Sequence, residues 1–165
     1  MVWYHLHIGM IPYSKLSVKY CNLFKKWYGI FNKGDYMNTG LIICTHKRTG
    51  VEIKNSVEMI TGMGDNIEVV EFLEDNSPEE VSEKYQNAIE KLNTNKVIFL
   101  VDIKGGTPFN CAARMKIENP SYEVITGVNI PMVISFLMTD ENEDIEQIIE
   151  NSINEAKNSI ERLAF

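Results

Sequence analysis

Two polar residues in this sequence could together make a nucleophilic histidine. Residues 37–165 contain one histidine, His46, which follows the short apolar run 40–44 together with Thr45. Asp102 directly follows a second apolar run, 96–101. A carboxylate bound to one imidazole nitrogen fixes the tautomer and leaves the lone pair of the other nitrogen pointing outward. It also stabilises positive charge developing on the ring, which is what a nucleophilic histidine requires.

A glycine-rich turn supplies the third element of the predicted site. Gly105 and Gly106 precede Thr107 and Pro108, and glycines let the backbone approach a ligand closely. We expect a helix to begin here with Thr107 as its N-cap, and free N–H groups at a helix N-terminus attract anions. With Thr45 beside His46, the predicted phosphoryl-binding residues are Thr45, Gly105, Gly106 and Thr107. The simplest interpretation is a transient phosphohistidine, formed without a metal or other cofactor.

Each of these signals also has an ordinary structural explanation. A histidine or aspartate after a strand is often a polar loop residue or a helix cap, and proline commonly lies in the first turn of a helix. Lys47 and Arg48 suit a phosphoryl group or an acidic partner, but equally a solvated basic turn. Cys44 and Cys111 fit small buried hydrophobes better than nucleophiles.

The elements that must position these residues alternate along the chain. Strands are predicted at 40–44, 67–72, 96–101 and 122–126, and helices at 50–61, after a Ser77 capping box, after Gly106, near Pro131 and from 145 to 163. Such alternation predicts an α/β doubly wound, mainly parallel sheet. The common order 2-1-3-4 reverses the winding between the first and third strands, and ligands bind at that crevice.

Composition indicates a globular protein and argues against nucleic-acid binding. The chain has 165 residues, with 44% hydrophobic and 24% charged residues and a net charge of −7, whereas nucleic-acid binders are normally basic. No apolar run approaches the roughly 18 residues that span a bilayer. Three widely spaced cysteines, an odd number without a CxxC pair, fit a reducing compartment rather than a disulfide framework or zinc site.

Residues 1–36 differ from the remainder of the chain. They contain five lysines, one acidic residue, both tryptophans and nine of the 16 aromatic residues. One interpretation is an arm that binds an anionic membrane surface or a partner. The plainer one is an N-terminal extension outside the working domain, because no sustained periodicity is present. We expect the domain to occupy residues 37–165, with Met37 as its natural start.

Four segments of the chain resemble the enzyme IIA component, mannose family, of the bacterial phosphoenolpyruvate-dependent sugar phosphotransferase system. They are residues 43–46 (ICTH), 57–62 (VEMITG), 99–114 (FLVDIKGGTPFN followed by CAAR) and 124–132 (VITGVNIPM). The resemblance covers roughly residues 39–160. It implies that His46 accepts a phosphoryl group from HPr on its distal ring nitrogen, that Asp102 orients the ring, and that Thr107 and the neighbouring glycines line the phosphoryl pocket.

The resemblance also implies partners and a cellular setting. A IIB component would accept the phosphoryl group, and membrane IIC and IID components would import the sugar, so we expect a cytoplasmic protein associated with the membrane through the transporter. The family is homodimeric with an exchanged antiparallel edge strand, for which residues 135–139 are a candidate. Because no IIB domain follows in this sequence, a separate IIB protein is expected. Lys47 replaces the family's usual glycine after the active histidine.

Three other functions remain open at this point. A phosphocarrier that feeds dihydroxyacetone kinase would use the same fold and histidine with a different acceptor. A receiver-like signalling module would instead be phosphorylated on Asp102, although such modules need an acidic pair after the first strand. A regulatory module that transfers no phosphoryl group would result if Lys47 spoils the site.

Overall fold

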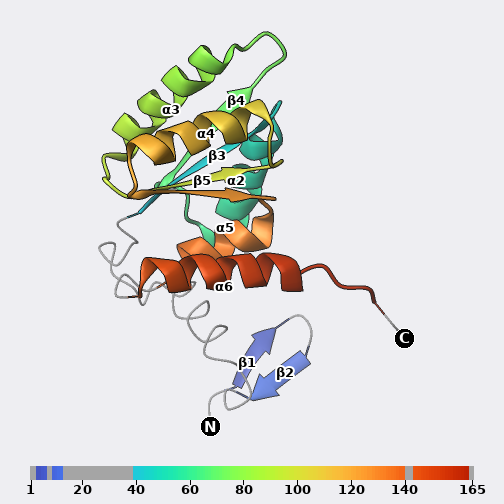
Figure 1. Ribbon diagram of the computed structural model, residues 1–165. Coiled ribbons are helices and arrows are strands. Elements are labelled where there is room, and N and C mark those ends of the chain that lie inside the picture. The colour runs from blue at the N-terminus through green and yellow to red at the C-terminus, as the bar shows by residue number, and fades with distance from the viewer. Residues whose placement is uncertain (1–2, 7–8, 13–38, 140–142, 164–165) are drawn as a thin grey trace. The chain divides into compact units, whose positions relative to one another are not determined.

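The computed structural model describes residues 3–6, 9–12, 39–139 and 143–163 (Figure 1). The chain divides into two compact units, Met1–Tyr36 and Met37–Phe165. In the first unit, β1 (Trp3–Leu6) and β2 (Gly9–Pro12) pair antiparallel. Four-residue strands are too short to register as periodicity in the sequence, which is why no element was expected there.

The second unit is built on four parallel strands. β3 (Gly40–His46), β4 (Ile67–Phe72), β5 (Val97–Val101) and β6 (Tyr122–Thr126) follow one another in the chain, and the spatial order is β4-β3-β5-β6. The predicted order 2-1-3-4 and the doubly wound α/β class are therefore confirmed. The winding reverses between β3 and β5, so the ends of these two strands are the place where a doubly wound sheet is expected to bind ligands.

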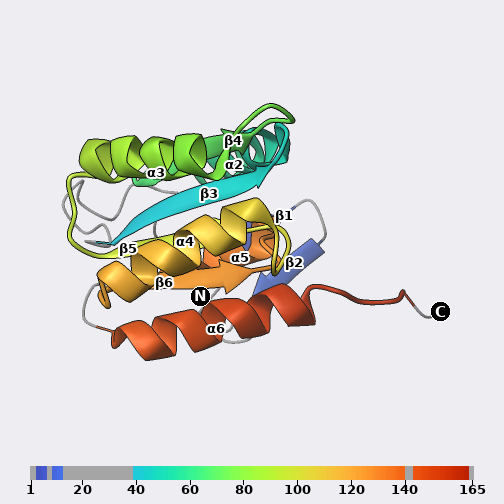
Figure 2. The ribbon, with the colours of Figure 1, turned by 45° about the horizontal axis from the view of Figure 1, so that its top comes forward.

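Five helices cover the two faces of this sheet. α3 (Pro78–Leu92) and α4 (Thr107–Glu118) lie on one face, as Figures 1 and 2 show, and α2 (Thr49–Thr61), α5 (Ile130–Leu137) and α6 (Ile145–Asn158) lie on the other. None of the helices in the described part of the chain combines the length and the apolar character needed to cross a bilayer.

Two apolar cores follow from the alternation of side chains along the strands. In β3, Leu41 and Ile43 pack toward α2, α5 and α6, whereas Ile42 and Cys44 pack toward α3 and α4. Successive strand residues point to opposite faces, so one strand contributes to both cores. All five residues of β5 are buried, which confirms the prediction of a strand covered on both sides.

Helix termini follow the local sequence signals closely in one case and depart from them in others. Ser77 forms the predicted capping box with Glu80: the Ser77 hydroxyl accepts from the Glu80 N–H, and the Glu80 carboxylate accepts from the Ser77 N–H. By contrast, Gly106 is the N-cap of α4 and Thr107 its first helical residue, so the prediction of Thr107 as the cap is wrong by one residue.

Two further predictions are corrected. The candidate exchanged strand at 135–139 is wrong in position, because α5 continues to Leu137 and buries Phe136 and Leu137 in the core. The final helix ends at Asn158, not near residue 163. Ile160 and Leu163, expected on its apolar stripe, lie beyond the helix and are exposed.

Candidate active site

His46 is the last residue of β3, and the parallel sheet brings it next to Asp102. The predicted strand 40–44 continues to His46, which lies opposite Phe72 of β4. On the other side, Cys44 pairs with Val101 at the end of β5, so Asp102 follows immediately at the same edge. Asp102 Oδ2 accepts a hydrogen bond from the His46 backbone N–H at 2.9 Å and lies 2.9 Å from His46 Nδ1.

The Asp102 carboxylate is ionised in this setting. Partial burial raises the pKa of its carboxyl, but hydrogen bonds from the His46 backbone N–H, the His46 ring and the Ile103 N–H outweigh burial and hold the pKa below its ordinary value. An ionised carboxylate accepts from a protonated Nδ1, which fixes the tautomer and leaves the Nε2 lone pair free. The His46 side chain is 44% exposed and that of Asp102 23%, so a reactive nitrogen can meet a partner.

The imidazole is confined on two sides. The ring of Phe72 meets it edge-on, with centroids 5.2 Å apart and an interplanar angle of 88°. At Gly106, a β-carbon would lie 3.3 Å from His46 Cε1, closer than a comfortable contact. Glycine at this position therefore leaves the imidazole its space beside the N-terminus of α4.

The turn that begins α4, which includes Gly106, is shaped by glycine and by two hydrogen bonds. Gly105 adopts a φ of 83°, a left-handed conformation that favours glycine. Asn110 in the first turns of α4 donates to the Gly105 carbonyl at 3.1 Å, and Tyr85 in α3 donates to the Pro108 carbonyl at 3.0 Å. The N–H groups of a first helical turn have no partner within the helix, so this turn presents donors and a positive dipole end beside His46.

The structure brings together five of the six predicted site residues and separates the sixth. His46 and Asp102 lie at the C-terminal ends of β3 and β5, and Gly105, Gly106 and Thr107 form the turn beside them that begins α4. Thr45 is fully buried, and its hydroxyl accepts from the Gly50 N–H at 2.7 Å. Its side chain points to the opposite face of the sheet because adjacent strand residues alternate. Thr45 therefore stabilises the start of α2, and its prediction as a phosphoryl-binding residue is wrong.

Sequence reasoning missed two residues that shape the site. Phe72 was assigned only to a strand, although its place at the end of the strand next to β3 is a signal that could have found it. Tyr85 was assigned only to the apolar face of a helix, and nothing local predicts its hydrogen bond to Pro108, 23 residues away.

The basic turn after His46 makes exposed ion pairs with β4 and the loop that follows it. The Lys47 ammonium pairs with the Glu74 carboxylate, and Arg48 Nε lies 3.5 Å from Glu71 Oε1. Lys47 has a φ of 57°, and its backbone N–H donates to the Phe72 carbonyl at 2.8 Å. Within the described residues, no group of three or more His, Cys, Asp or Glu side chains could hold a metal ion.

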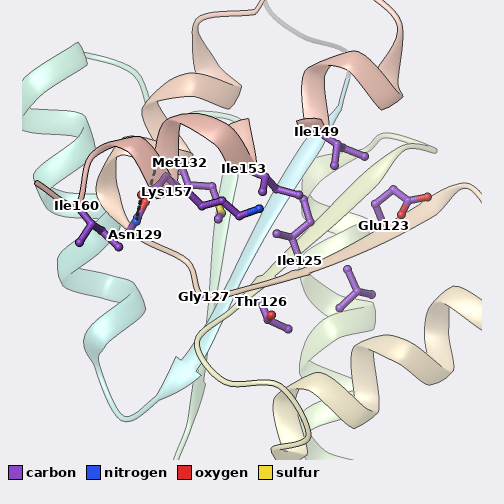
Figure 3. Close-up of a pocket in the computed structure, with 12 residues that line it drawn as sticks. Glu123, Ile125, Thr126, Gly127, Asn129, Met132, Ile149, Ile153, Lys157 and Ile160 are labelled. Carbon is purple, nitrogen blue, oxygen red and sulfur yellow. Dashed lines mark hydrogen bonds between the residues drawn. The ribbon is translucent and has the colours of Figure 1, made fainter. Parts of the chain in front are cut away.

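A separate pocket of about 540 Å³ lies between β6, α5 and α6. Figure 3 shows Ile153 of α6 and Ile125 of β6 close together, with Met132 nearby and the Lys157 side chain extending toward Ile153. None of the predicted site residues lines it. The pocket runs along the outer edge of β6. Within the described residues, β5 is the one strand that pairs with β6.

Comparison with known proteins identifies the class to which this fold and site belong. Residues 40–153 match the family model EIIA-man, described as "PTS system fructose IIA component". The chain belongs to this family of IIA components of the sugar phosphotransferase system.

Individual relatives agree with this assignment. The chain is 33% identical over 129 residues to the mannose-specific EIIAB component of Escherichia coli (strain K12), covering 77% of this chain and 40% of the relative. It thus spans about two fifths of that relative's length. It is 32% identical over 112 residues to the fructose-specific EIIA component of Bacillus subtilis (strain 168), covering 67% of this chain and 77% of the relative.

Solved structures agree on the fold. The mannose/sorbose specific IIA subunit from Enterococcus faecalis superposes with a TM-score of 0.70 at 22% identity, covering 78% of this chain and 97% of that one. EIIA from Streptococcus agalactiae superposes with a TM-score of 0.68 at 22% identity, covering 75% and 96%.

Proposed function

We propose that this protein is a cytoplasmic histidine phosphocarrier. Nε2 of His46 accepts a phosphoryl group from HPr and passes it to a IIB component during uptake of a mannose-family sugar through membrane IIC and IID components. The observation that carries this proposal is the bond between Asp102 Oδ2 and His46 Nδ1 at 2.9 Å, which leaves one nucleophilic nitrogen facing outward. The family and the names of the relatives support the pathway.

The transfer is an in-line displacement between two ring nitrogens. The Nε2 lone pair forms the new P–N bond as the donor's P–N bond breaks and its electron pair returns to the donor ring. The proton on His46 Nδ1 stays in its hydrogen bond to Asp102, whose negative charge compensates the positive charge on the phosphorylated ring. The turn 105–107 contributes N–H groups, the Thr107 hydroxyl and the α4 dipole to the phosphoryl oxygens. Passing the group to IIB reverses these steps.

We propose that the working form is a homodimer. Within the described residues β6 is an edge strand of the sheet, and the unpaired backbone groups of an edge strand are a template for pairing with a second chain. The pocket beside it is lined largely by apolar side chains, including Ile149 and Ile153. Sedimentation equilibrium tests this: a monomer across the micromolar range would contradict it.

Phosphorylation assays with substituted histidines test the carrier function. Wild-type protein, His46→Ala and a His5→Ala/His7→Ala control are each incubated with phosphoenolpyruvate, enzyme I and HPr. We expect an acid-labile, alkali-stable adduct on wild type and on the control, lost only in His46→Ala and mapped to position 46 by mass spectrometry.

Other outcomes of this assay identify the alternatives. An alkali-labile adduct at Asp102 would favour the receiver-like module, and no adduct on any form would favour a regulatory module. Adding a purified IIB component, or the dihydroxyacetone kinase in its place, then determines which acceptor removes the phosphoryl group from His46. Transfer to the kinase alone would contradict the sugar-uptake proposal and leave the carrier chemistry intact.

A further inference from the structure

Lys47 holds a backbone conformation that a lysine seldom adopts. Its φ of 57° lies in the left-handed region, and among the described residues only one other non-glycine residue, Asn93, has a positive φ. Asn93 caps α3, where asparagine is common in this conformation. Lys47 is not at such a cap: it directly follows His46, and the bond from its N–H to the Phe72 carbonyl holds it there. Strained backbone of this kind is typical of functional sites.

The side chain of Lys47 lies on the β4 side of the imidazole. Its ammonium pairs with Glu74, two residues after Phe72, whose ring meets the imidazole edge-on. Gly106 and the N-terminus of α4 approach from the side of β5. The site thus has a helix N-terminus on the β5 side, and the adjacent residue Lys47 carries a flexible cation that pairs beyond the end of β4. Both groups favour negative charge.

The ion pair that holds this ammonium is a weak one. The side chains of Lys47 and Glu74 are 59% and 79% exposed, and a single exposed ion pair contributes little free energy. A phosphoryl group carries close to two negative charges at neutral pH, against one on a carboxylate. An ammonium released from the carboxylate is therefore attracted more strongly by the phosphoryl group than by the carboxylate.

We propose that Lys47 is a phosphoryl-binding residue of this chain: when His46 is phosphorylated, the ammonium leaves Glu74 and pairs with the phosphoryl oxygens. Glu74 keeps the ammonium beside the site while His46 is unmodified. The exchange stabilises phosphohistidine relative to the free imidazole and involves no covalent step. This inference rests on the proposed phosphocarrier function and deepens it by adding a charged side chain to the glycine-rich turn.

The test is the equilibrium constant for phosphoryl exchange between phospho-HPr and His46, measured by ³¹P NMR. Lys47→Met removes the charge and keeps the chain length, Lys47→Arg keeps the charge, and Glu74→Gln frees the ammonium. Arg48→Met is the matched control, because it removes a cation one residue further on that pairs with Glu71. Lys47→Met should lower the constant roughly two- to fivefold, and Glu74→Gln should raise it about twofold.

The dependence on salt concentration distinguishes an electrostatic effect of Lys47 from a structural effect of replacing it. The equilibrium constants of Lys47→Arg and Arg48→Met should stay close to that of wild type. The difference in this constant between wild type and Lys47→Met should shrink as ionic strength rises from about 0.05 M to about 0.5 M. A constant for Lys47→Met equal to that of wild type, or an equal loss in Arg48→Met, would overturn the role of Lys47 while His46 still becomes phosphorylated. No adduct at His46 in wild type would instead overturn the proposed function, and this inference with it.

Discussion

A single oxygen atom of Asp102 accepts two hydrogen bonds from His46. Oδ2 lies 2.9 Å from both the backbone N and the ring Nδ1 of His46, and Oδ1 accepts from the Ile103 N–H at 2.9 Å. The carboxylate thereby ties the imidazole to the main chain of the same residue and to the loop after β5. Rotation of the ring would break one of these bonds, so its orientation is fixed before any partner arrives.

Replacing Asp102 by Asn should slow phosphoryl transfer to His46 by roughly 10- to 100-fold, because the amide keeps the shape and loses the charge that stabilises the ring as it becomes cationic. Rapid-quench measurement with phospho-HPr gives the rate. Asp75→Asn, in the loop after β4, is the matched control and should leave the rate near that of wild type. An unchanged rate in Asp102→Asn would contradict the role of the carboxylate.

The same carboxylate makes stability depend on pH in a predictable direction. The pKa of Asp102 in the folded protein is below its ordinary value, so the unfolded state binds the proton more readily. The stabilisation is complete above the unfolded pKa of about 3.9 and is lost as pH falls toward the lower folded value. Urea unfolding between pH 6 and pH 3 should show wild type losing its advantage over Asp102→Asn as pH falls. A constant difference would contradict this.

Gly106→Ala should impair transfer with little loss of stability. The φ of Gly106 is −72°, which alanine adopts freely, but the added β-carbon would lie 3.3 Å from His46 Cε1 and push the ring aside. We expect a roughly three- to tenfold slower transfer, since small misplacements of reacting groups are costly.

Gly127→Ala should have the opposite effects, a loss of stability without slower phosphoryl transfer. Gly127 has a φ of 82° and no atom near a built β-carbon, so alanine there should lower the free energy of unfolding by about 1 kcal/mol and leave transfer intact. If Gly127→Ala slows transfer as much as Gly106→Ala does, crowding of the imidazole is not the cause.

Lys47→Gly should raise the free energy of unfolding by about 0.5–1 kcal/mol, because glycine adopts a positive φ without strain and the lost surface ion pair contributes little. Thermal or urea unfolding measures the gain. Asn93→Gly should gain less, since asparagine tolerates the same conformation. A loss of stability in Lys47→Gly would show that the pair with Glu74 outweighs the backbone strain.

The two buried thiols should be inert in the native protein. Burial raises the pKa of Cys44 to about 12, despite a hydrogen bond with Tyr85 that lowers it, and Cys111 is also buried. At pH 8, peptide mapping after iodoacetamide treatment should find both unlabelled, Cys44 because the thiolate is the reactive form and Cys111 because its side chain is buried. Labelling in urea is the control; rapid native labelling would contradict the packing around α4.

Much of the fold follows from the pattern of apolar runs. Parallel strands end at a common edge, so placing His46 and Asp102 after two apolar runs was enough to predict their meeting once the strand order was assumed. The capping box at Ser77 is also a local signal, formed within four residues. Features that depend on a few neighbouring residues, or on burial of a whole strand, can be predicted from a sequence.

The wrong or missing predictions concern side chains whose positions depend on tertiary contacts. Thr45 looked like a crevice residue because β3 was expected to end at Cys44; the strand continues, and the alternation of its side chains turns Thr45 into the core. The pairs of Lys47 with Glu74 and Tyr85 with Pro108 join residues 27 and 23 positions apart. No local pattern encodes such contacts, because they depend on how two loops or two helices meet.

Because Asp102 occupies Nδ1, His46 offers a single nitrogen for exchange, and two proteins cannot use it at the same moment. In the proposed relay, HPr must depart before IIB arrives. Steady-state turnover should then give parallel double-reciprocal lines. An excess of unphosphorylated HPr or of unphosphorylated IIB should inhibit transfer involving the other protein, because both bind at His46. The rate of sugar entry would thus depend on the balance between the two proteins as well as on the amount of each.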